Sequence, residues 1–417
     1  MPLRKHILAV GAILFSTALY LMGNGLIGVL IPVRGHANGF TNLALGVIGS
    51  AYFAGFVLGC FLGPRLLARS GHSRTFGVGA GISAATVLLQ SILVSVGVWI
   101  ALRFAFGMAA ACMYMVIESW LNDRATNENR GRIFSAYLTV NFSSLIVGQM
   151  LFATSRPTGF QLFSLAAVCY ALCLVPIGLT RLPQPHAAHV PTLRPLRLYA
   201  IAPVGVMGCI AVGFANSAVW TLAPVYAASH GLAKGWIAIF MSVFTLGGAL
   251  IQPPLGRLSD KMDRRYIIVF VCVAAAALGV ALATFGARHR DWILPLIGCF
   301  GVVALPLYGL SVAHANDRIP REEFVETSAT LLMINSLASV SGPTLAALVM
   351  GAFGTATLFF YTAAIHVAMA AFTLVRIGVK SGAGDVHRDK FESTPPQSTQ
   401  LEAALDPRGA DDQKEAA

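Results

Sequence analysis

The stretch ILAVGAILFSTALYLMGNGLIGVLI, residues 7–31, runs for 25 residues without a charged side chain. The hydrocarbon core of a bilayer is about 30 Å thick, and a helix needs about 20 apolar residues to cross it. Arg4 and Lys5 precede the run as in a signal peptide, but the run is too long for a signal-peptide core and lacks an Ala-x-Ala-like cleavage site. Residues 7–31 therefore predict a first transmembrane helix.

The composition of the whole chain supports the same interpretation. Of its 417 residues, 56% are hydrophobic and 11% are charged, whereas a soluble domain carries about 25% charged residues. A chain with so few charges lies mainly in lipid, so the lipid bilayer is its first expected partner. The net charge of +11 does not indicate nucleic-acid binding, because membrane proteins collect Lys and Arg on their cytoplasmic side.

Twelve stretches of the chain are long and apolar enough to span a bilayer. We expect them to be helices, because an open strand would leave backbone N–H and C=O groups unpaired in lipid. The predicted fold class is an all-α membrane protein with 12 transmembrane helices. The expected spans are residues 7–31, 43–64, 75–97, 99–121, 133–155, 160–180, 199–222, 236–254, 266–287, 292–313, 326–350 and 355–377.

Two breaks in the hydrophobic pattern divide the chain. Residues 182–198 contain four prolines among polar residues, which predicts a cytoplasmic central linker between a six-helix half at 1–181 and a second half at 199–379. From residue 380 onward, 13 of the last 38 residues are charged and no apolar period appears. This composition predicts a disordered cytoplasmic tail over residues 380–417.

The distribution of Lys and Arg predicts the orientation of the chain in the membrane. Alternate loops and both termini together hold 23 of the 29 basic residues, and the opposite loops hold five. Basic residues mark the cytoplasmic side of short loops. We therefore expect a multi-pass protein of the inner (plasma) membrane with both termini in the cytoplasm.

The two sets of six spans are related by an internal repeat. A shift of 192 or 194 residues superimposes seven positions in collinear order, including an Asn-Asp-Arg tripeptide. Because each copy has an even number of helices, both copies have the same orientation, and their pseudo-two-fold axis runs along the membrane normal. Transporters of this design bind solute between the halves near mid-membrane. The matched positions are Asn24 with Asn216, Pro32 with Pro224, Ser50 with Ser242, Gly55 with Gly247, residues 122–124 with 316–318, Asn141 with Asn335, and Gly148 with Gly342.

Three short motifs resemble those of a known family. The loop GRLSDKMDRR, residues 256–265, is similar to the G-x-L-a-D-r-x-G-r-r signature of the major facilitator superfamily, with Asp263 in place of its second glycine. LRFAFG, residues 102–107, resembles the R-x-x-q-G pattern of that family, and ESWLNDR, residues 118–124, looks like a little-characterised bacterial branch of it. The resemblance implies the superfamily's fold and a solute transporter that works by alternating access.

Charged residues at the cytoplasmic helix ends are the candidates for a gate. Opposite charges on neighbouring ends can form a clasp that breaks when the transporter changes state, and the alternative is a set of solvated charges that orient the chain. The first-half copy of the loop has Ala68 where the motif has its acid, so Glu118 or Asp123 is expected to serve Arg69, Arg130 and Arg132 instead. The gate candidates are Arg69, Gly71, Arg74, Glu118, Asp123, Arg124, Arg130, Arg132, Gly256, Asp260, Arg264, Arg265, Asp317 and Arg318.

Polar residues inside the spans are the candidates for a solute cavity. Arg103 either binds an anionic or hydroxyl-rich solute through its fork of donors, or has a structural role against neighbouring carbonyls or the outer surface. Pairs such as Tyr20 and Asn24 are four residues apart and share a helix face, although Asn and Gln also join helices without binding solute. The cavity candidates are Tyr20, Asn24, Arg103, Asn141, Gln149, Asn216, Trp220, Tyr308 and Asn335.

These patterns predict a secondary active or facilitative transporter of a small organic solute, polar or anionic, working by a rocker switch. The alternative is a transporter-like receptor or scaffold without net transport. An enzyme is not expected, because the sequence shows no nucleophile, metal ligands or carboxylate pair at the interface, and no phosphate-binding loop for ATP. We expect no cofactor or metal and a monomer; the coupling proton or ion, if any, and the direction of transport stay open.

Overall fold

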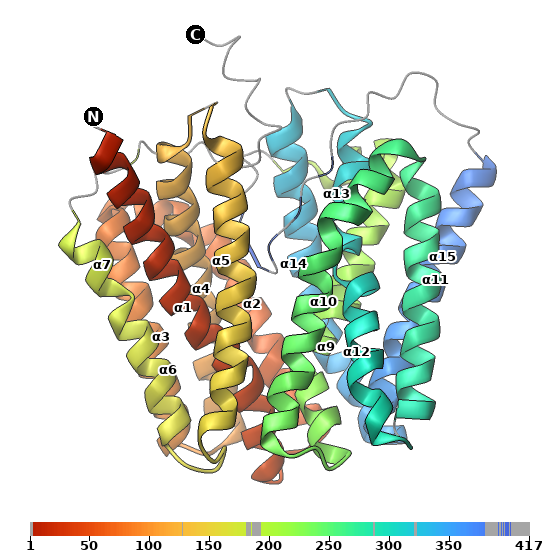
Figure 1. Ribbon diagram of the computed structural model, residues 1–417, viewed down its shortest axis with the longest axis horizontal. Helices are drawn as coiled ribbons and strands as arrows, with labels where there is room; N and C mark the ends of the chain where they lie inside the picture. The colour runs from red at the N-terminus through yellow and green to blue at the C-terminus, as the bar shows by residue number, and fades with distance from the viewer. Residues whose placement is uncertain are drawn as a thin grey trace.

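The computed structural model describes residues 3–126, 128–180, 185, 193–286, 288–320 and 323–379, together with 391, 393, 395, 397–399 and 401 of the tail. These residues include 12 helices or helix pairs that are long and apolar enough to cross a membrane. Figure 1 shows them as two bundles side by side, the first half from red to yellow and the second from green to blue. The expected all-α, 12-span fold class is confirmed.

The first half contains six spans. α6 and α7 form one span with a break at Cys173, and a short 3₁₀ turn, η1 (Phe152–Thr154), extends α5. The helices are α1 (Leu3–Ala37), α2 (Asn42–Ser70), α3 (His72–Ile92), α4 (Val96–Arg124), α5 (Arg130–Leu151), α6 (Gln161–Leu172) and α7 (Leu174–Leu179).

The second half repeats this arrangement after a short helix. α12 and α13 form one span with a break at residues 305–306, and a π-helical turn, η2 (Leu282–Gly286), extends α11. The helices are α8 (Pro195–Ile201), α9 (Pro203–Ser229), α10 (Lys234–Lys261), α11 (Arg264–Ala281), α12 (Arg290–Ala304), α13 (Leu307–Asn316), α14 (Phe324–Phe353) and α15 (Thr357–Val379).

Three boundaries differ from those expected. The turn between the third and fourth spans lies at residues 93–95 rather than at 98, because Leu93 and Val94 are apolar and no Gly or Pro marks the turn. α8 begins at Pro195, inside the expected linker 182–198, as proline is well tolerated in the first turn of a helix. Asp260 lies on the last turn of α10 instead of beyond it.

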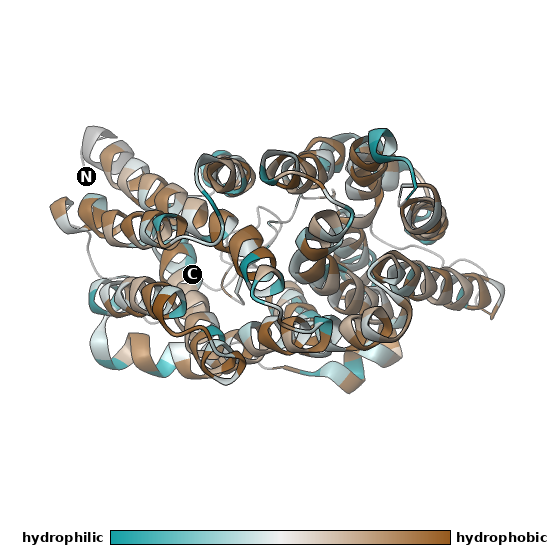
Figure 2. Ribbon diagram, turned by 90° about the horizontal axis from the view of Figure 1, so that it is seen from below, coloured by the Kyte–Doolittle hydropathy of each residue, from teal (hydrophilic) through white to brown (hydrophobic). Residues whose placement is uncertain are grey.

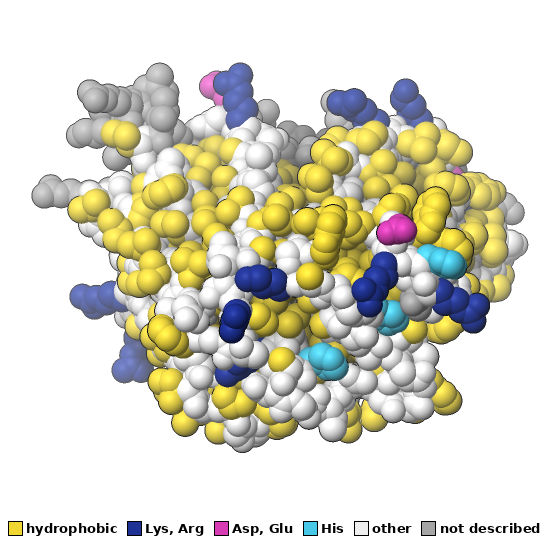
Figure 3. All heavy atoms as spheres, turned by 60° about the horizontal axis from the view of Figure 1, so that its bottom comes forward, with side chains coloured by type: hydrophobic (Ala, Val, Ile, Leu, Met, Phe, Trp, Pro, Cys, Tyr) yellow, Lys and Arg dark blue, Asp and Glu magenta, His cyan; other side chains and the backbone are white. Residues whose placement is uncertain are grey.

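The outer surface of the bundle is apolar, as lipid contact requires. Figure 2, viewed along the helices, shows hydrophobic residues on the outward helix faces, and Figure 3 shows a broad area of hydrophobic side chains with Lys and Arg above and below it. Large apolar side chains such as Leu250, Phe270 and Val375 are more than half exposed. In water such a surface would drive aggregation, so its place is the hydrocarbon core.

Glycines at equivalent positions show that the repeat is structural. A Cβ atom on Gly55 would overlap the backbone of α4 at Phe104, and one on Gly247 would overlap the backbone of α12 at Gly298. In the same way, Gly148 lies against the backbone of α1 and Gly342 against that of α9. Small residues let helices approach closely in lipid. Here the glycines lie at equivalent helix crossings in the two halves.

The two halves touch each other near one end of the bundle, which we call the far end. The other end, where α1 begins and α15 ends, we call the termini end (Figure 1). Near the start of α2, the Asn42 amide donates to the carbonyl of Met350 on α14 at 3.3 Å, and the hydroxyls of Ser50 and Thr344 are 2.7 Å apart. The halves are therefore joined at the far end, with cavities between them.

The crossing of α2 and α4 provides a stability test. A Cβ atom on Gly107 would overlap the carbonyl oxygen of Tyr52, whereas one on Gly97, in the same helix, meets open space. We expect Gly107→Ala to destabilise the protein by about 1–3 kcal/mol, the usual effect of overpacking. Gly97→Ala, the matched control, is expected to be neutral or stabilising by up to about 1 kcal/mol. Thermal unfolding of the purified variants measures both, and equal melting temperatures would contradict the close crossing.

Candidate solute cavity

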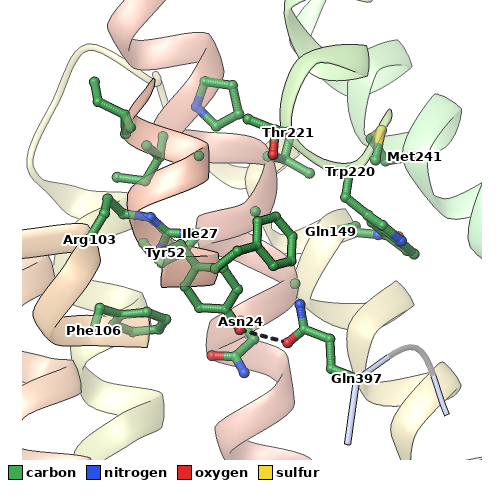
Figure 4. Close-up of a pocket in the computed structure, with 18 of the residues that line it drawn as sticks. Asn24, Ile27, Tyr52, Arg103, Phe106, Gln149, Trp220, Thr221, Met241 and Gln397 are labelled. Carbon is green, nitrogen blue, oxygen red and sulfur yellow. Dashed lines mark hydrogen bonds between the residues drawn. The ribbon is translucent and has the colours of Figure 1, made fainter. Parts of the chain in front are cut away.

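Two adjoining, partly open cavities lie between the halves, and their empty volumes, counted with the solvent at their mouths, are about 920 Å³ and about 830 Å³. Tyr52, Trp220 and Gln397 line both cavities. Figure 4 shows the first cavity, with Arg103 and Phe106 on one side and Gln149 and Trp220 on the other.

Arg103 is the cation of the first cavity. Its guanidinium carbon lies 4.6 Å from the centre of the Tyr52 ring and 5.1 Å from that of Phe106, within the range of cation–π attraction. Its Nε is buried without a hydrogen-bond partner among the described residues, and none of their carboxylates forms a salt bridge with it. An arginine held this way has donors to offer to an acceptor or anionic group on a ligand.

A chain of hydrogen bonds leads from the first-half core into the cavity. The Tyr170 hydroxyl donates to the Asn24 side-chain oxygen at 3.0 Å, and the Asn24 amide donates to the Tyr114 hydroxyl at 3.5 Å. The Tyr114 hydroxyl in turn donates to the side-chain oxygen of Gln397 at 3.3 Å. The two tyrosines therefore fix the orientation of the Asn24 side chain. A side chain that binds a solute by hydrogen bonds needs such a fixed orientation.

The second-half wall combines an aromatic face with an amide link across the interface. The Trp220 ring lies edge-on to Phe244, with the ring centres 5.2 Å apart. The Gln149 amide of α5 donates to the Thr245 hydroxyl of α10 at 3.0 Å. Gln149 thus lines the cavity and joins the halves at the same time, so binding there would be coupled to their relative position.

Seven of the nine cavity candidates from the sequence line these cavities. Asn24, Arg103, Gln149 and Trp220 line the first, and Asn216, Trp220, Tyr308 and Asn335 line the second.

The other two candidates lie outside both cavities. Tyr20 is fully buried between the rings of Tyr114 and Tyr170. Asn141 is 1% exposed, lines neither cavity, and donates to the carbonyl of Tyr137 on its own helix. Helical spacing places a residue on a face, but it does not tell which neighbour that face meets.

Sequence reasoning missed the wall contributed by α2 and α10. Tyr52, Phe53 and Gln252 line the cavities, although no cavity candidate was drawn from these two helices. The signal was present in the repeat, because Ser50 and Ser242 marked α2 and α10 as equivalent helices. Tyr52 also lies one turn from Phe56, in a helix that is otherwise mainly aliphatic.

Comparison with known proteins settles the family. The family model described as Major Facilitator Superfamily matches residues 13–323 and, in a second match, residues 205–407. The chain belongs to the Major Facilitator Superfamily. The second match begins near the start of α9, in agreement with the internal repeat.

The relatives of this superfamily member include uncharacterised proteins and solved structures. An "Uncharacterized MFS-type transporter YcaD" of Salmonella typhimurium is 29% identical over 328 residues, which cover 77% of this chain and 83% of that one. The nucleoside transporter NupG has a TM-score of 0.73 at 13% identity, covering 91% of this chain and 100% of its own. A bacterial homologue of the human lysosomal transporter Spinster, inward-facing and occupied, has a TM-score of 0.71 at 15% identity, covering 90% and 97%. At these identities the two structures show the shared fold alone.

The superfamily loop motif forms a buried charge network in the second half. Arg264, 1% exposed, bonds Asp317 on one side at 2.7 Å and Asp260 on the other at 3.2 Å. It also donates to the Ser259 hydroxyl at 2.8 Å. Arg264 therefore joins the ends of α10, α11 and α13, so the expected clasp residues Asp260, Arg264 and Asp317 come together within one half.

Asp263, the departure from the superfamily motif, caps α11. Its carboxylate accepts from the backbone N–H of Arg265 at 3.0 Å and pairs with the Arg265 side chain at 2.7 Å. Burial alone would raise the pKa of the Asp263 carboxyl, but the hydrogen bonds and charge of Arg265 outweigh it and hold that pKa below its usual value. Arg318 lies half-buried beside this group, and burial followed by repulsion from Arg265 lowers its pKa.

The first-half copy of the network is built differently. Asp123 pairs with its neighbour Arg124 at 3.6 Å, not with the more distant arginines expected from the sequence. Gly71 turns the chain between α2 and α3 at a φ of +76°, a value that favours glycine. Arg69, Arg74 and Arg132 are exposed, whereas Arg124 and Arg130 are buried.

Glu118 is a fully buried carboxylate on α4, toward the termini end. It accepts a hydrogen bond from the Tyr137 hydroxyl at 3.3 Å and one from the backbone N–H of Thr399 at 3.1 Å. The hydroxyl of Thr399 donates to the same carboxylate. Glu118 was expected to serve arginines of the gate, and the structure adds the tail to its partners.

The tail that the sequence predicts to be disordered contributes described residues to both cavities. Pro395, Gln397 and Ser398 line the second cavity, and Gln397 reaches the first. The average composition of the 38 tail residues is highly charged. It conceals residues 391–401, which contain a single charge, Glu392. That local drop in charge is the signal that could have found it.

The buried arginine of the loop motif provides a direct test. We expect Arg264→Gln to cost about 3–5 kcal/mol, because it leaves the buried Asp317 carboxylate without its charge partner. Arg257→Gln, at an exposed position of the same motif, is the matched control and is expected to have little effect on stability. Thermal unfolding of the two purified variants makes the comparison. A melting temperature for Arg264→Gln equal to that of the control would show that the network contributes little.

Proposed function

We propose that this protein is a secondary active or facilitative transporter that moves a small polar or anionic organic solute between its two halves. The observation that carries the proposal is Arg103, a cation without an acidic partner among the described residues, at the wall of a cavity between the halves. A charged side chain within a membrane span is expensive and marks a functional site by default. Asn24, Gln149 and Trp220 would add hydrogen bonds and an aromatic face.

The chemistry of the walls supports a solute rich in acceptors or hydroxyl groups. Arg103 offers donors only, and its neighbours Tyr52 and Phe106 exclude water from one side of it. Two of the solved structures with the same fold are named as a nucleoside transporter and a D-xylose–proton symporter, whose solutes carry several hydroxyls. A solute of this class would replace the missing partner of Arg103.

The mechanism we propose is a rocker switch. The halves meet through α2 and α14 at the far end, and the positive-inside rule puts the termini end in the cytoplasm. On this proposal the present structure is closed to the outside and directed to the cytoplasm. Solute release and reloading would require the far-end contacts to open while the termini end closes.

Binding by Arg103 is tested in two steps. The purified protein is first screened by thermal shift against nucleosides, pentoses, hexoses and small carboxylates, and the strongest stabiliser is then followed by counterflow in proteoliposomes. We expect Arg103→Gln to raise the half-saturation concentration at least tenfold and Arg103→Lys to raise it less, since the point charge remains. Arg156→Gln, exposed in the loop before α6, is the control and should leave it unchanged.

Two results would contradict the proposal. Stabilisation by bulky apolar cations alone would exclude a polar or anionic solute bound at Arg103. Tight binding without any exchange of labelled solute would favour a receptor or scaffold built on a transporter fold.

The far-end contact between Ser50 and Thr344 tests the rocking motion. Their hydroxyl oxygens are 2.7 Å apart across the two halves, so the double variant Ser50→Cys/Thr344→Cys should form a disulfide on oxidation. We expect oxidation to lower counterflow at least tenfold and reduction to restore it. Each single cysteine variant is the control. Undiminished counterflow in the cross-linked protein would rule out opening at the far end.

A further inference from the structure

The described tail residues lie between the two halves and touch both of them. Figure 1 shows them as a short blue trace between α5 and α14. On the first half, they contact Glu118, Tyr52 and Tyr114; on the second, they contact the loop-motif residues Gly256 and Asp260. A transporter that rocks must change the distance between these two groups of residues.

The first-half contacts are specific hydrogen bonds in a buried setting. Both oxygens of Glu118 accept from the Thr399 N–H at 3.1 Å, and the Thr399 hydroxyl donates to the same carboxylate. The Gln397 side-chain oxygen accepts from Tyr52 at 2.8 Å, as Figure 4 shows, and from Tyr114 at 3.3 Å. Thr399 is fully buried and Ser398 is 4% exposed. This is the bonding pattern of a bound ligand.

The second-half contacts involve the superfamily motif itself. The Phe391 N–H donates to the Asp260 carboxylate at 2.8 Å, next to the Arg264 guanidinium. A Cβ atom on Gly256 would overlap the Phe391 ring, so the motif's glycine leaves room for that side chain. The ring packs against an apolar cluster that contains Leu255. The loop motif thus contacts the tail through Gly256 and Asp260.

Chemistry explains why this segment can enter the cavity. Residues 391–401 carry one charge, whereas the flanking residues of the tail carry many. A stretch with a single charge loses less by leaving water than its charged flanks would, and its backbone N–H and amide groups find partners in Glu118, Asp260 and the tyrosines. A carboxylate that accepts several donors makes stronger hydrogen bonds than a neutral acceptor would.

We propose that the cavity contains a binding site for the chain's own tail, with Phe391 at one end and Thr399 at the other, and that the bound tail inhibits the protein. Bound in this way, the tail covers the cavity from the termini end and links the two halves through Asp260 and Glu118. A solute that enters from that end must displace Gln397, which lines the first cavity together with Arg103. Inhibition of solute movement by the tail rests on the proposed function. Binding of the tail in the cavity does not depend on it.

The tail site is tested with a cysteine at Ser398 in the full-length protein. Cys299, the exposed native cysteine, is replaced by Ser, and the other six native cysteines are buried. The rate at which a bulky maleimide alkylates Ser398→Cys, read on the peptide that contains position 398, is compared in the folded and the detergent-denatured protein. We expect the folded protein to react at least tenfold more slowly, because position 398 is enclosed.

Variants of the partners separate a bound tail from a merely slow reaction. Glu118→Gln turns part of the acceptor into an NH₂ group that faces the Thr399 N–H, so we expect alkylation to accelerate at least fivefold. Gln397→Ala/Thr399→Ala removes the side-chain contacts of the tail, those of the Gln397 amide oxygen and the Thr399 hydroxyl, without altering the helices, and should also accelerate alkylation. Glu323→Gln, whose carboxylate pairs with Arg197 on the surface, is the matched control and should leave the rate unchanged.

Alkylation of the folded protein as fast as the denatured one would overturn the tail site, and so would equal rates in all variants. Inhibition itself is read from counterflow, which Gln397→Ala/Thr399→Ala should raise at least threefold over the unmodified protein. An unchanged counterflow rate would overturn inhibition while leaving the site in place. Protection at position 398 with no counterflow in any variant would instead contradict the proposed transport, since alkylation requires no solute.

Discussion

The cost of an unpaired charge in hydrocarbon governs this structure. A charge removed from water, in the bilayer or in the protein interior, is unfavourable by several kcal/mol unless it is hydrogen-bonded or paired. Arg264 satisfies the requirement with two aspartates, and Glu118 satisfies it with Tyr137 and the tail. Arg103 has no such acidic partner among the described residues. The two satisfied charges hold helix ends and tail in place, and the third is the one that we propose binds the solute.

Much of the fold follows from the sequence because lipid permits so few solutions. All 12 spans, their pairing into halves and the location of the loop motif could be predicted from apolar length, the repeat and the pattern of residues 256–265. The positions of the turns were harder to predict from the sequence. The turn at residues 93–95 consists of apolar residues and a serine, and lipid-facing composition does not tell a turn from the helix beside it.

The cavity was predictable only in part, because its walls come from contacts between helices far apart in the chain. Asn24 and Asn216 could be found from the repeat, since equivalent helices place equivalent residues between the halves. Tyr20, one turn from Asn24, was assigned to the same face, yet its ring lies behind the wall against Tyr170. The tail was hidden for a different reason: the low charge of residues 391–401 is a local feature that the average over the tail conceals.

The central claim is that the two halves rock about the cavity, and distances across them test it most directly. Spin labels at Ser73 and Met262, exposed residues at the termini end, report on one opening, and labels at Arg156 and Lys234, exposed at the far end, report on the other. Double electron–electron resonance in nanodiscs should show two distance populations for each pair. Conditions that lengthen one distance should shorten the other. A single, unchanging distance at both ends, with the tail bound or released, would contradict the account.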